Sequence, residues 1–361
     1  MNTSYPLIIV DAHQDIGYNY MEDGRDFLKP ALVKRQFEDN SPDAVKGRGI
    51  VTCSLPEALM GRVGIIFATL YASPKFSPMP AKFSYETPRE AYQIGMAQLD
   101  YYKRLLDNDS RLALIHDQSS MQQVLATWAA GTEFIDRKLG LVILMEGADP
   151  VIEPRQAEEW YEQGVRIIGP AWSETRYSGG TGRPGPLTPL GFELLQVMSS
   201  LGMILDLSHM AEKAYLQAVD HYAGVVIASH SNPRHFVDRD RMLSDEMILR
   251  LAERGGVMGL VPFNRFMLSG WTYGTNTKEQ VTIDHFIDMI DYVCQLTGSV
   301  RHVGIGTDWD GGFGAESIPT PFDTIADLWL LHDALQGRGF EADDIQAILG
   351  GNFLRILSEG L

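Results

Sequence analysis

Residues 203–232 read MILDLSHMAEKAYLQAVDHYAGVVIASHSN, and this stretch decides the fold. Two short apolar runs, at 203–207 and 225–228, flank a segment of helical character at 211–221. Continuous apolar runs of this kind are typical of parallel strands that are buried on both faces and joined by a helix. A histidine follows each run, His209 after the first and His230 after the second. The stretch therefore predicts a strand, a helix and a parallel strand, with a histidine beyond the end of each strand.

The same pattern extends over the rest of the 361-residue chain. Further apolar runs lie at 7–10, 63–70, 141–145, 165–169, 256–261 and 302–306. The segments between them predict helices at 88–106, 155–163, 189–201, 245–254, 283–296 and 321–336, and a final helix near 343–357. Eight strands with helical crossovers favour an α/β fold that closes into a (β/α)8 TIM barrel. A doubly wound sheet is the alternative, but the chain has no glycine-rich dinucleotide turn.

No repeat, low-complexity tract or linker interrupts this order, so residues 1–361 are predicted to form a single catalytic domain with two insertions. The first insertion, at about 17–62, is mixed and charged, and we expect a loop or small excursion beside the active-site face. The second, at about 173–189, reads SETRYSGGTGRPGPLTP. Its density of glycine and proline predicts an irregular loop over the barrel mouth.

Composition and charge exclude several classes of partner. The chain is 45% hydrophobic and 21% charged, as in a globular protein. Its formal net charge of -17 argues against nucleic acid and anionic membrane surfaces, because both would repel it. The N-terminal apolar run is too short for a signal peptide and no run could span a bilayer, which predicts a cytoplasmic location. Cys53 and Cys294 are too few for a disulfide framework or a thiolate zinc site.

Candidate metal ligands follow the first, third, fifth, sixth and eighth predicted strands. They stand in the motifs IIVDAHQD, VILMEGAD, MILDLSHM, VVIASHSN and HVGIGTDWDGG, and they are His13, Asp15, Glu146, His209, His230 and Asp308. The carboxyl ends of all strands in a barrel meet on one face, so these side chains are expected to lie close together. Each alone has an ordinary explanation as a helix cap or turn residue, but such roles give no reason for this clustering.

Nitrogen and oxygen ligands without thiolate suit zinc, with manganese or iron as substitutes. A catalytic zinc ion usually takes about three protein ligands and a water, so one ion would not use the whole set. Two ions that share a carboxylate would use it. Paired ions some 3.5 to 4 Å apart lower the pKa of a shared water and polarise the bond that it attacks. The pattern therefore favours a hydrolase with two metal ions.

At these residues the chain resembles the membrane (renal) dipeptidase family, peptidase family M19 of the amidohydrolase superfamily. The resemblance extends from DAHQD near the start to GNFLRIL near the end, and its most specific parts are DAHQD, MEGAD, DLSHM, ASHSNPR with DRDRMLSDE, and VGIGTDWDGG. It implies a TIM barrel of the metal-dependent hydrolase type. The implied activity is hydrolysis of the peptide bond of small dipeptides, including those with a D-residue at the C-terminal position. A homodimer is implied as well.

The resemblance also implies a role for each residue. The metal ligands divide into two half-sites, one for each Zn²⁺, that share a bridging residue: His13 with Asp15, His209 with His230, and Glu146 between them. A hydroxide that bridges the ions would attack the substrate. Asp308 matches the acidic residue that accepts and delivers the proton. Arg241 matches the arginine that grips the substrate carboxylate, although its charged surroundings, DRDRMLSDE, also allow an ordinary surface cation.

Two positions depart from the family pattern. Members carry a histidine after the fourth strand that stabilises the developing oxyanion, but here Trp172 stands there, in IIGPAWSE. Its indole NH donates one hydrogen bond but cannot take up a proton. Asp149 replaces another family histidine in MEGAD. Trp172 and Asp149 are both expected to lie near the substrate, and Arg176 or Tyr177 is the candidate replacement donor.

The departures leave two alternatives to a zinc dipeptidase. One is an amidohydrolase for another small amide, such as an N-acyl amino acid or a secondary-metabolite precursor. The other is a non-hydrolytic family member with a tailoring or binding role. Retention of Asp308 argues against the second alternative, because a purely structural metal site needs no positioned base.

Overall fold

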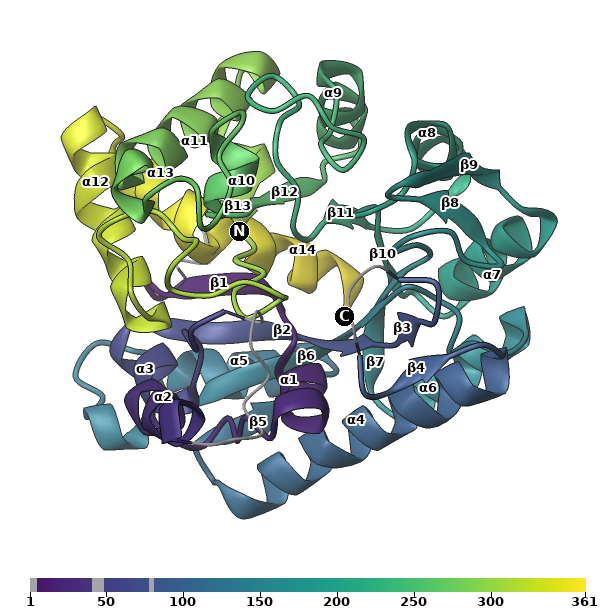
Figure 1. The fold of residues 1–361 in the computed structure, drawn as a ribbon, viewed down its shortest axis with the longest axis horizontal. Coiled ribbons are helices and arrows are strands. Elements are labelled where there is room, and N and C mark those ends of the chain that lie inside the picture. Colours follow the sequence, from purple (N-terminus) through teal and green to yellow (C-terminus); the bar gives the residue numbers. More distant parts are fainter. Residues whose placement is uncertain (1–4, 41–48, 78–80) are drawn as a thin grey trace.

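The computed structural model describes residues 5–40, 49–77 and 81–361. Eight parallel strands form a closed ring, because the last strand pairs with the first and the second pairs with β6 (Figure 1). In ring order they are β1 (Ile9–Gln14), β2 (Val63–Tyr71), β6 (Leu139–Glu146), β7 (Val165–Gly169), β10 (Ile204–Asp206), β11 (Val226–Ala228), β12 (Val257–Leu260) and β13 (Val303–Ile305). The predicted barrel and all eight predicted strands are confirmed.

Helices lie around the outside of the ring (Figure 1). They include α4 (Pro88–Asn108), α6 (Ala157–Glu162), α7 (Pro189–Ser200), α8 (Glu212–His221), α9 (Asp245–Glu253), α11 (Ile283–Thr297), α12 (Leu330–Arg338), α13 (Ala342–Gln346) and α14 (Asn352–Gly360). Local signals explain several starts: the Thr87 side chain caps α4, Thr188 caps α7 and Ser244 caps α9. The predicted helix at 321–336 begins later than expected, because the 3-10 turn Ile325–Trp329 precedes α12.

The ring strands are buried along their whole length, including all nine residues of β2. This burial on both faces explains why the strands read as continuous apolar runs. The turn Ala347–Gly351, before α14, packs against the start of β1. A Cβ on Gly350 would lie 2.5 Å from the carbonyl oxygen of Ile8, so only glycine permits this approach.

A strand and a helix between α4 and β6 were not predicted. The strand is β5 (Leu112–Leu114), which pairs with the first residues of β6. The later residues of β6 pair on the same edge with β7, while β2 pairs along the opposite edge. The helix α5 (Gln118–Ala126) follows β5. With only three residues, two of them half-exposed, β5 has too little apolar periodicity to be recognised.

Of the two forms expected for the first insertion, a loop or a small excursion, the structure shows the excursion. It contains α1 (Ile16–Asp23), α2 (Ala31–Asn40) and α3 (Leu55–Met60), and its residues 41–48 lie outside the described chain. The helices α1 and α3 are only eight and six residues long, so the apolar period has little room to show.

The second insertion is not irregular. Its core is an antiparallel hairpin of β8 (Ser178–Gly180) and β9 (Arg183–Leu187). Proline is usually confined to edge strands because it cannot donate to the ladder. In this two-stranded sheet Ser178 pairs with Leu187 and Gly180 with Arg183, so neither proline of β9 occupies a paired position.

Within the described ranges, no helix has both the length and the apolar character needed to cross a membrane. Cys53 and Cys294 are buried and form no disulfide. The single-domain organisation stays a prediction.

Candidate metal centre

Six polar side chains meet at the carboxyl ends of the ring strands. His13 is the penultimate residue of β1, and Glu146 is the last residue of β6. The other four side chains follow the ends of β1, β10, β11 and β13, and they are Asp15, His209, His230 and Asp308. The structure thus brings together all the residues that the sequence singled out as metal ligands or base. Their binding of metal stays a prediction.

Glu146 lies at the centre of this group. One of its carboxylate oxygens, Oε1, lies 3.2 Å from Nε2 of His209 and 3.1 Å from Nε2 of His230. The other, Oε2, lies 3.7 Å from Nε2 of His13. The two carboxylate oxygens of Glu146 therefore face different histidines.

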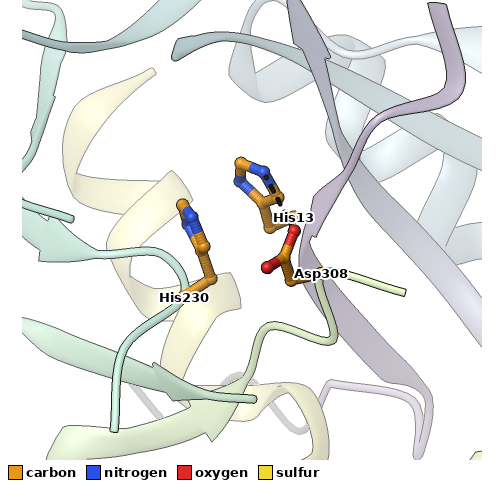
Figure 2. A group of neighbouring side chains, drawn as sticks. All are labelled: His13, His230 and Asp308. Carbon is orange, nitrogen blue, oxygen red and sulfur yellow. Dashed lines mark ion pairs between the residues drawn. The ribbon is translucent and has the colours of Figure 1, made fainter. Parts of the chain in front are cut away.

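His13 faces three carboxylates. Its Nε2 lies 3.8 Å from Oδ1 of Asp15 and 3.8 Å from Oδ1 of Asp308, in addition to Glu146. Figure 2 shows His13 between Asp308 and His230, and the imidazole rings of the two histidines stack at 3.6 Å. Three sets of ligand atoms fall within 4.8 Å of one another: His13, Asp15 and Glu146; Glu146, His209 and His230; and His13, His230 and Asp308. The first two sets coincide with the half-sites that the resemblance implies.

Burial shifts the pKa values of the side chains in this group. It raises the pKa of Asp15 to about 6, and burial together with the charges of Asp15 and Asp308 raises the pKa of Glu146 well above its usual value. Burial also lowers the pKa of His13 well below its ordinary value, so this ring is neutral near pH 7. A cation would displace the protons that these raised pKa values favour, and the neutral imidazole already has the form that a metal ligand needs.

A zinc ion fits this donor set. Both ring nitrogens of His13 are buried and have no hydrogen-bond partner among the described residues. Buried polar atoms in proteins are nearly always partnered, so an orphaned imidazole that faces carboxylates calls for a cation between them. Imidazole nitrogens and carboxylate oxygens suit zinc.

A hydrogen-bonded relay orients His230. The carboxylate of Asp206 accepts hydrogen bonds from the backbone N–H of Ser229 at 2.8 Å and from its hydroxyl at 2.5 Å. Since the hydroxyl gives its one proton to Asp206, its oxygen accepts from Nδ1–H of His230 at 2.8 Å. This tautomer leaves the lone pair of Nε2 free to bind metal.

The hairpin of the second insertion supports His209. Oγ1 of Thr181, in the hairpin turn, lies 3.0 Å from Nδ1 of His209. The backbone of Ala211 donates to the carbonyl of Gly179 at 3.1 Å, which ties β8 to the loop that carries the histidine. His209 has a φ of 65°, a left-handed conformation that costs energy for a non-glycine residue and is held here by these contacts.

The Asp308 loop is held by the first insertion. Asp308 and Asp310 have φ values of 54° and 66°. The carboxylate of Asp310 accepts hydrogen bonds from the backbone and hydroxyl of Thr52 at 2.8 and 2.7 Å and from the backbone of Cys53 at 3.1 Å. A Cβ on Gly311 would lie 2.1 Å from Oδ1 of Asp308, so this position requires glycine.

Replacing Ser229 by alanine is expected to weaken zinc binding about 10- to 100-fold, the usual effect of losing a hydrogen bond that orients a ligand. The variant keeps every ligand but frees the His230 ring to rotate. Competition against a chromophoric chelator would measure the affinity, and Ser200→Ala, at the end of α7, is the matched control. Equal affinities for Ser229→Ala and the parent protein would show that the relay does not orient the ligand.

A cavity of about 410 Å³ opens beside these residues. Three aromatic side chains that stand at or after the ends of β1, β2 and β7 line part of the cavity: Tyr18, Tyr71 and Trp172. Arginines from the loops beyond β11 and β12 line another: Arg239, Arg241 and Arg265. The carboxylates of Asp15, Glu146 and Asp308 also border the cavity. The site therefore combines a cluster of acidic and imidazole groups with a cationic wall.

Arg241 is not a surface cation. It is buried, and its guanidinium donates to the hydroxyl of Ser231 at 3.1 Å and to the carbonyl of His230. Burial lowers its pKa, and the charges of Asp308 and Glu146 oppose that shift. A buried guanidinium that borders the cavity is placed to bind an anionic substrate group.

Trp172 borders the cavity as expected, with its ring 6.0 Å from that of His209. Asp149 does not border it. The carboxylate of Asp149 accepts hydrogen bonds from the Tyr85 hydroxyl at 2.5 Å and from the Arg176 backbone at 3.1 Å, so it anchors the second insertion instead. The geometry gives no support to a substrate contact by Asp149.

Neither proposed replacement donor reaches the cavity. The guanidinium of Arg176 bonds the carbonyls of Val151 and Ile152, and the Tyr177 hydroxyl bonds the carbonyl of Val151. The sequence argument missed Tyr71, the last residue of β2, which does border the cavity. The rule that located the metal ligands, a polar group at the end of a strand, would have found it.

The family model for membrane dipeptidases, peptidase family M19, matches residues 4–360. An uncharacterized protein in the pqqA 5' region of Klebsiella pneumoniae is 31% identical over 62% of this chain and 82% of its own. An uncharacterized dipeptidase of Schizosaccharomyces pombe is 28% identical over 74% of this chain and 62% of its own. A metallo peptidase from Rhodobacter sphaeroides, solved with a phosphinate mimic of the dipeptide L-Ala-D-Ala, superposes with a TM-score of 0.77 at 19% identity, covering 99% of this chain and all of that one. This last likeness shows a shared fold.

Proposed function

The chain belongs to the membrane dipeptidase family and is a metal-dependent peptide-bond hydrolase, and from this premise we propose that it cleaves small dipeptides with two zinc ions. The substrates include dipeptides with a D-residue at the C-terminal position, since the Rhodobacter relative binds a mimic of one. The cytoplasmic location and the homodimer stay predictions.

The observation that carries the proposal is the position of Glu146. Its two oxygens face histidines of different half-sites, at 3.1 to 3.7 Å. We assign His13 and Asp15 to one ion, His209 and His230 to the other, and Glu146 to both. Zinc ions held there would supply a water of lowered pKa and would polarise the scissile carbonyl.

The chain's own residues bind the substrate and move the proton. Arg241 pairs with the terminal carboxylate and fixes the peptide relative to the metal ligands. Oδ1 of Asp308 lies 3.8 Å from Nε2 of His13, beside the proposed metal ligands, where the carboxylate can accept a proton. Oδ1 of Asp308 then delivers this proton to the departing amine.

Tyr71 is the donor that we assign in place of the missing family histidine. Its side chain is buried and borders the cavity. Burial raises the pKa of its hydroxyl, an effect that the nearby Ser73 side chain only partly opposes, so the group stays protonated and able to donate. Its backbone pairs in register with Glu146, and its ring packs 5.2 Å from that of Trp172. A buried hydroxyl so placed is free to donate to the developing oxyanion.

Tyr71→Phe is expected to lower kcat about 100-fold, the usual effect of losing one oxyanion donor, with little change in KM. Steady-state kinetics on one dipeptide would measure the change. Tyr92→Phe, which removes a hydroxyl that bonds Glu159 away from the cavity, is the control. If kcat fell equally in both variants, Tyr71 would have no specific role.

A second candidate function is hydrolysis of N-acyl amino acids. The aromatic wall of Tyr71 and Trp172 suits an acyl group. Among the other carboxylates that border the cavity, Asp240 accepts from the backbone of Gly182 at 2.7 Å and Asp310 from that of Thr52, so both already have partners. A free substrate ammonium would have to compete with these hydrogen bonds.

A substrate panel tests both candidates. The zinc-loaded protein would be incubated with L,L and L,D dipeptides and with the same compounds after N-acetylation, and its metal content would be measured. We expect cleavage of free dipeptides. Cleavage of acylated compounds alone would favour the second candidate, and inactivity on the whole panel despite two bound ions would exclude both.

A further inference from the structure

The cavity carries more positive charge than one terminal carboxylate requires. Arg241 meets that requirement in the proposed function. Arg239, two residues earlier, and Arg265, in the short helix α10 (Asn264–Met267) beyond β12, border the same cavity. Their presence is notable in a chain with a net charge of -17.

Neither of these two arginines has a counter-ion. Within the described ranges, the side chains of Arg239 and Arg265 make no ion pair and no hydrogen bond, whereas other cations such as Arg25, Arg35 and Arg234 each pair with a carboxylate. Asp240, the residue after Arg239, also borders the cavity, but its carboxylate accepts a hydrogen bond from the Gly182 backbone.

The two guanidiniums also repel each other. Partial burial, followed by the positive charge of Arg265, lowers the pKa of Arg239. Like charges that share one wall destabilise the free protein, and an anion placed between them removes the repulsion and adds charge-assisted hydrogen bonds.

Apolar rings limit the room around this pair. Phe263 stacks on Phe313 with ring centroids 3.9 Å apart, and Phe266 meets Phe263 at 4.8 Å. All three rings border the cavity, and the Phe266 ring lies 5.9 Å from the guanidinium of Arg241. Such a wall suits a short hydrocarbon chain that ends in a charged group, and it strengthens the ion pair by excluding water.

We propose that Arg239 and Arg265 form a subsite for an acidic side chain, so that the preferred substrates are dipeptides with aspartate or glutamate at the C-terminal position. The subsite rests on the proposed function, in which Arg241 holds the terminal carboxylate. One dicarboxylate residue would then satisfy the three arginines of the cavity.

The test compares substrates that differ only in charge. For Ala-Asp and Ala-Asn, in L,L and L,D forms, kcat/KM of the zinc-loaded protein should favour the acid at least about tenfold, as expected for charge-assisted hydrogen bonds. In Arg239→Gln and Arg265→Gln the ratio of the two kcat/KM values should fall toward unity, mainly through a loss of the Ala-Asp value. Arg89→Gln, on the exposed face of α4, makes the same change of net charge and should keep the preference.

Calorimetric binding of free aspartate and asparagine to the same variants separates the subsite from the proposed function. If no dipeptide is cleaved but aspartate binds more tightly than asparagine and loses this advantage in both variants, the subsite stands and the proposed function fails. Equal binding of the two amino acids, or equal cleavage of the two dipeptides, would overturn the subsite while leaving dipeptide hydrolysis intact.

Discussion

Glu146→Gln is expected to remove nearly all activity and at least one of the two zinc ions. Glutamine is almost the same size, but it exchanges one carboxylate oxygen for an amide nitrogen that cannot bind metal. Whichever oxygen is lost, one set of contacts disappears, either that to His13 or that to His209 and His230. We expect kcat/KM to fall on the order of a thousandfold or more, because metal activation contributes several kcal/mol.

Metal analysis by mass spectrometry and kinetics on one dipeptide would measure both effects. The control is Glu153→Gln, an exposed position outside the cavity. A thermal unfolding scan would show that the variant is folded. Retention of two ions with parental kcat/KM would contradict the bridging role of Glu146.

Asp308→Asn is expected to separate catalysis from metal binding. The amide keeps the shape of the side chain but cannot accept the proton, so kcat should fall about 10²- to 10⁴-fold. Since Asp308 is not one of the proposed ligands, both zinc ions should remain and KM should change little. The pair of results, low kcat with full metal content, distinguishes this variant from Glu146→Gln.

The matched control for Asp308→Asn is Asp238→Asn, on the exposed part of the loop between β11 and α9. Stopped assays over long incubations would give the residual rate. If turnover in Asp308→Asn equalled that of the parent protein, the proton-transfer role would belong to another group.

The barrel was predictable because each ring strand is buried on both faces. Burial along the whole of β2 and β6 produces apolar runs that a sequence shows directly. The apolar pattern did not reveal α1 or the hairpin of β8 and β9. These elements are short, so the side chains that pack against the rest of the protein do not form a repeating pattern in the sequence. Short elements of this kind depend on tertiary contacts, such as those of Asp310 with Thr52, that no local pattern reveals.

The clustering of the candidate metal ligands was predictable for a geometric reason, and the other residues that border the cavity were not. Parallel strands bring their carboxyl ends together, so position along a strand was sufficient to group Glu146 with His209. Asp149 stands only three residues after Glu146, yet it points to Tyr85, away from the cavity. Arg239 lies in the loop after β11 and Arg265 in α10, and both border the same cavity. Their spacing along the chain does not show this shared position.

The pairing of β1 with β13 has a consequence for biosynthesis. The strand that carries His13 is made first and the strand that precedes Asp308 nearly last, and they meet only when Asp11 pairs with Ile305. A nascent chain would therefore hold several of the proposed zinc ligands long before it possesses Asp308, the proposed base. We expect a partly synthesised barrel that binds a metal ion to have no hydrolytic activity. It could not turn over a substrate until its final strand had left the ribosome.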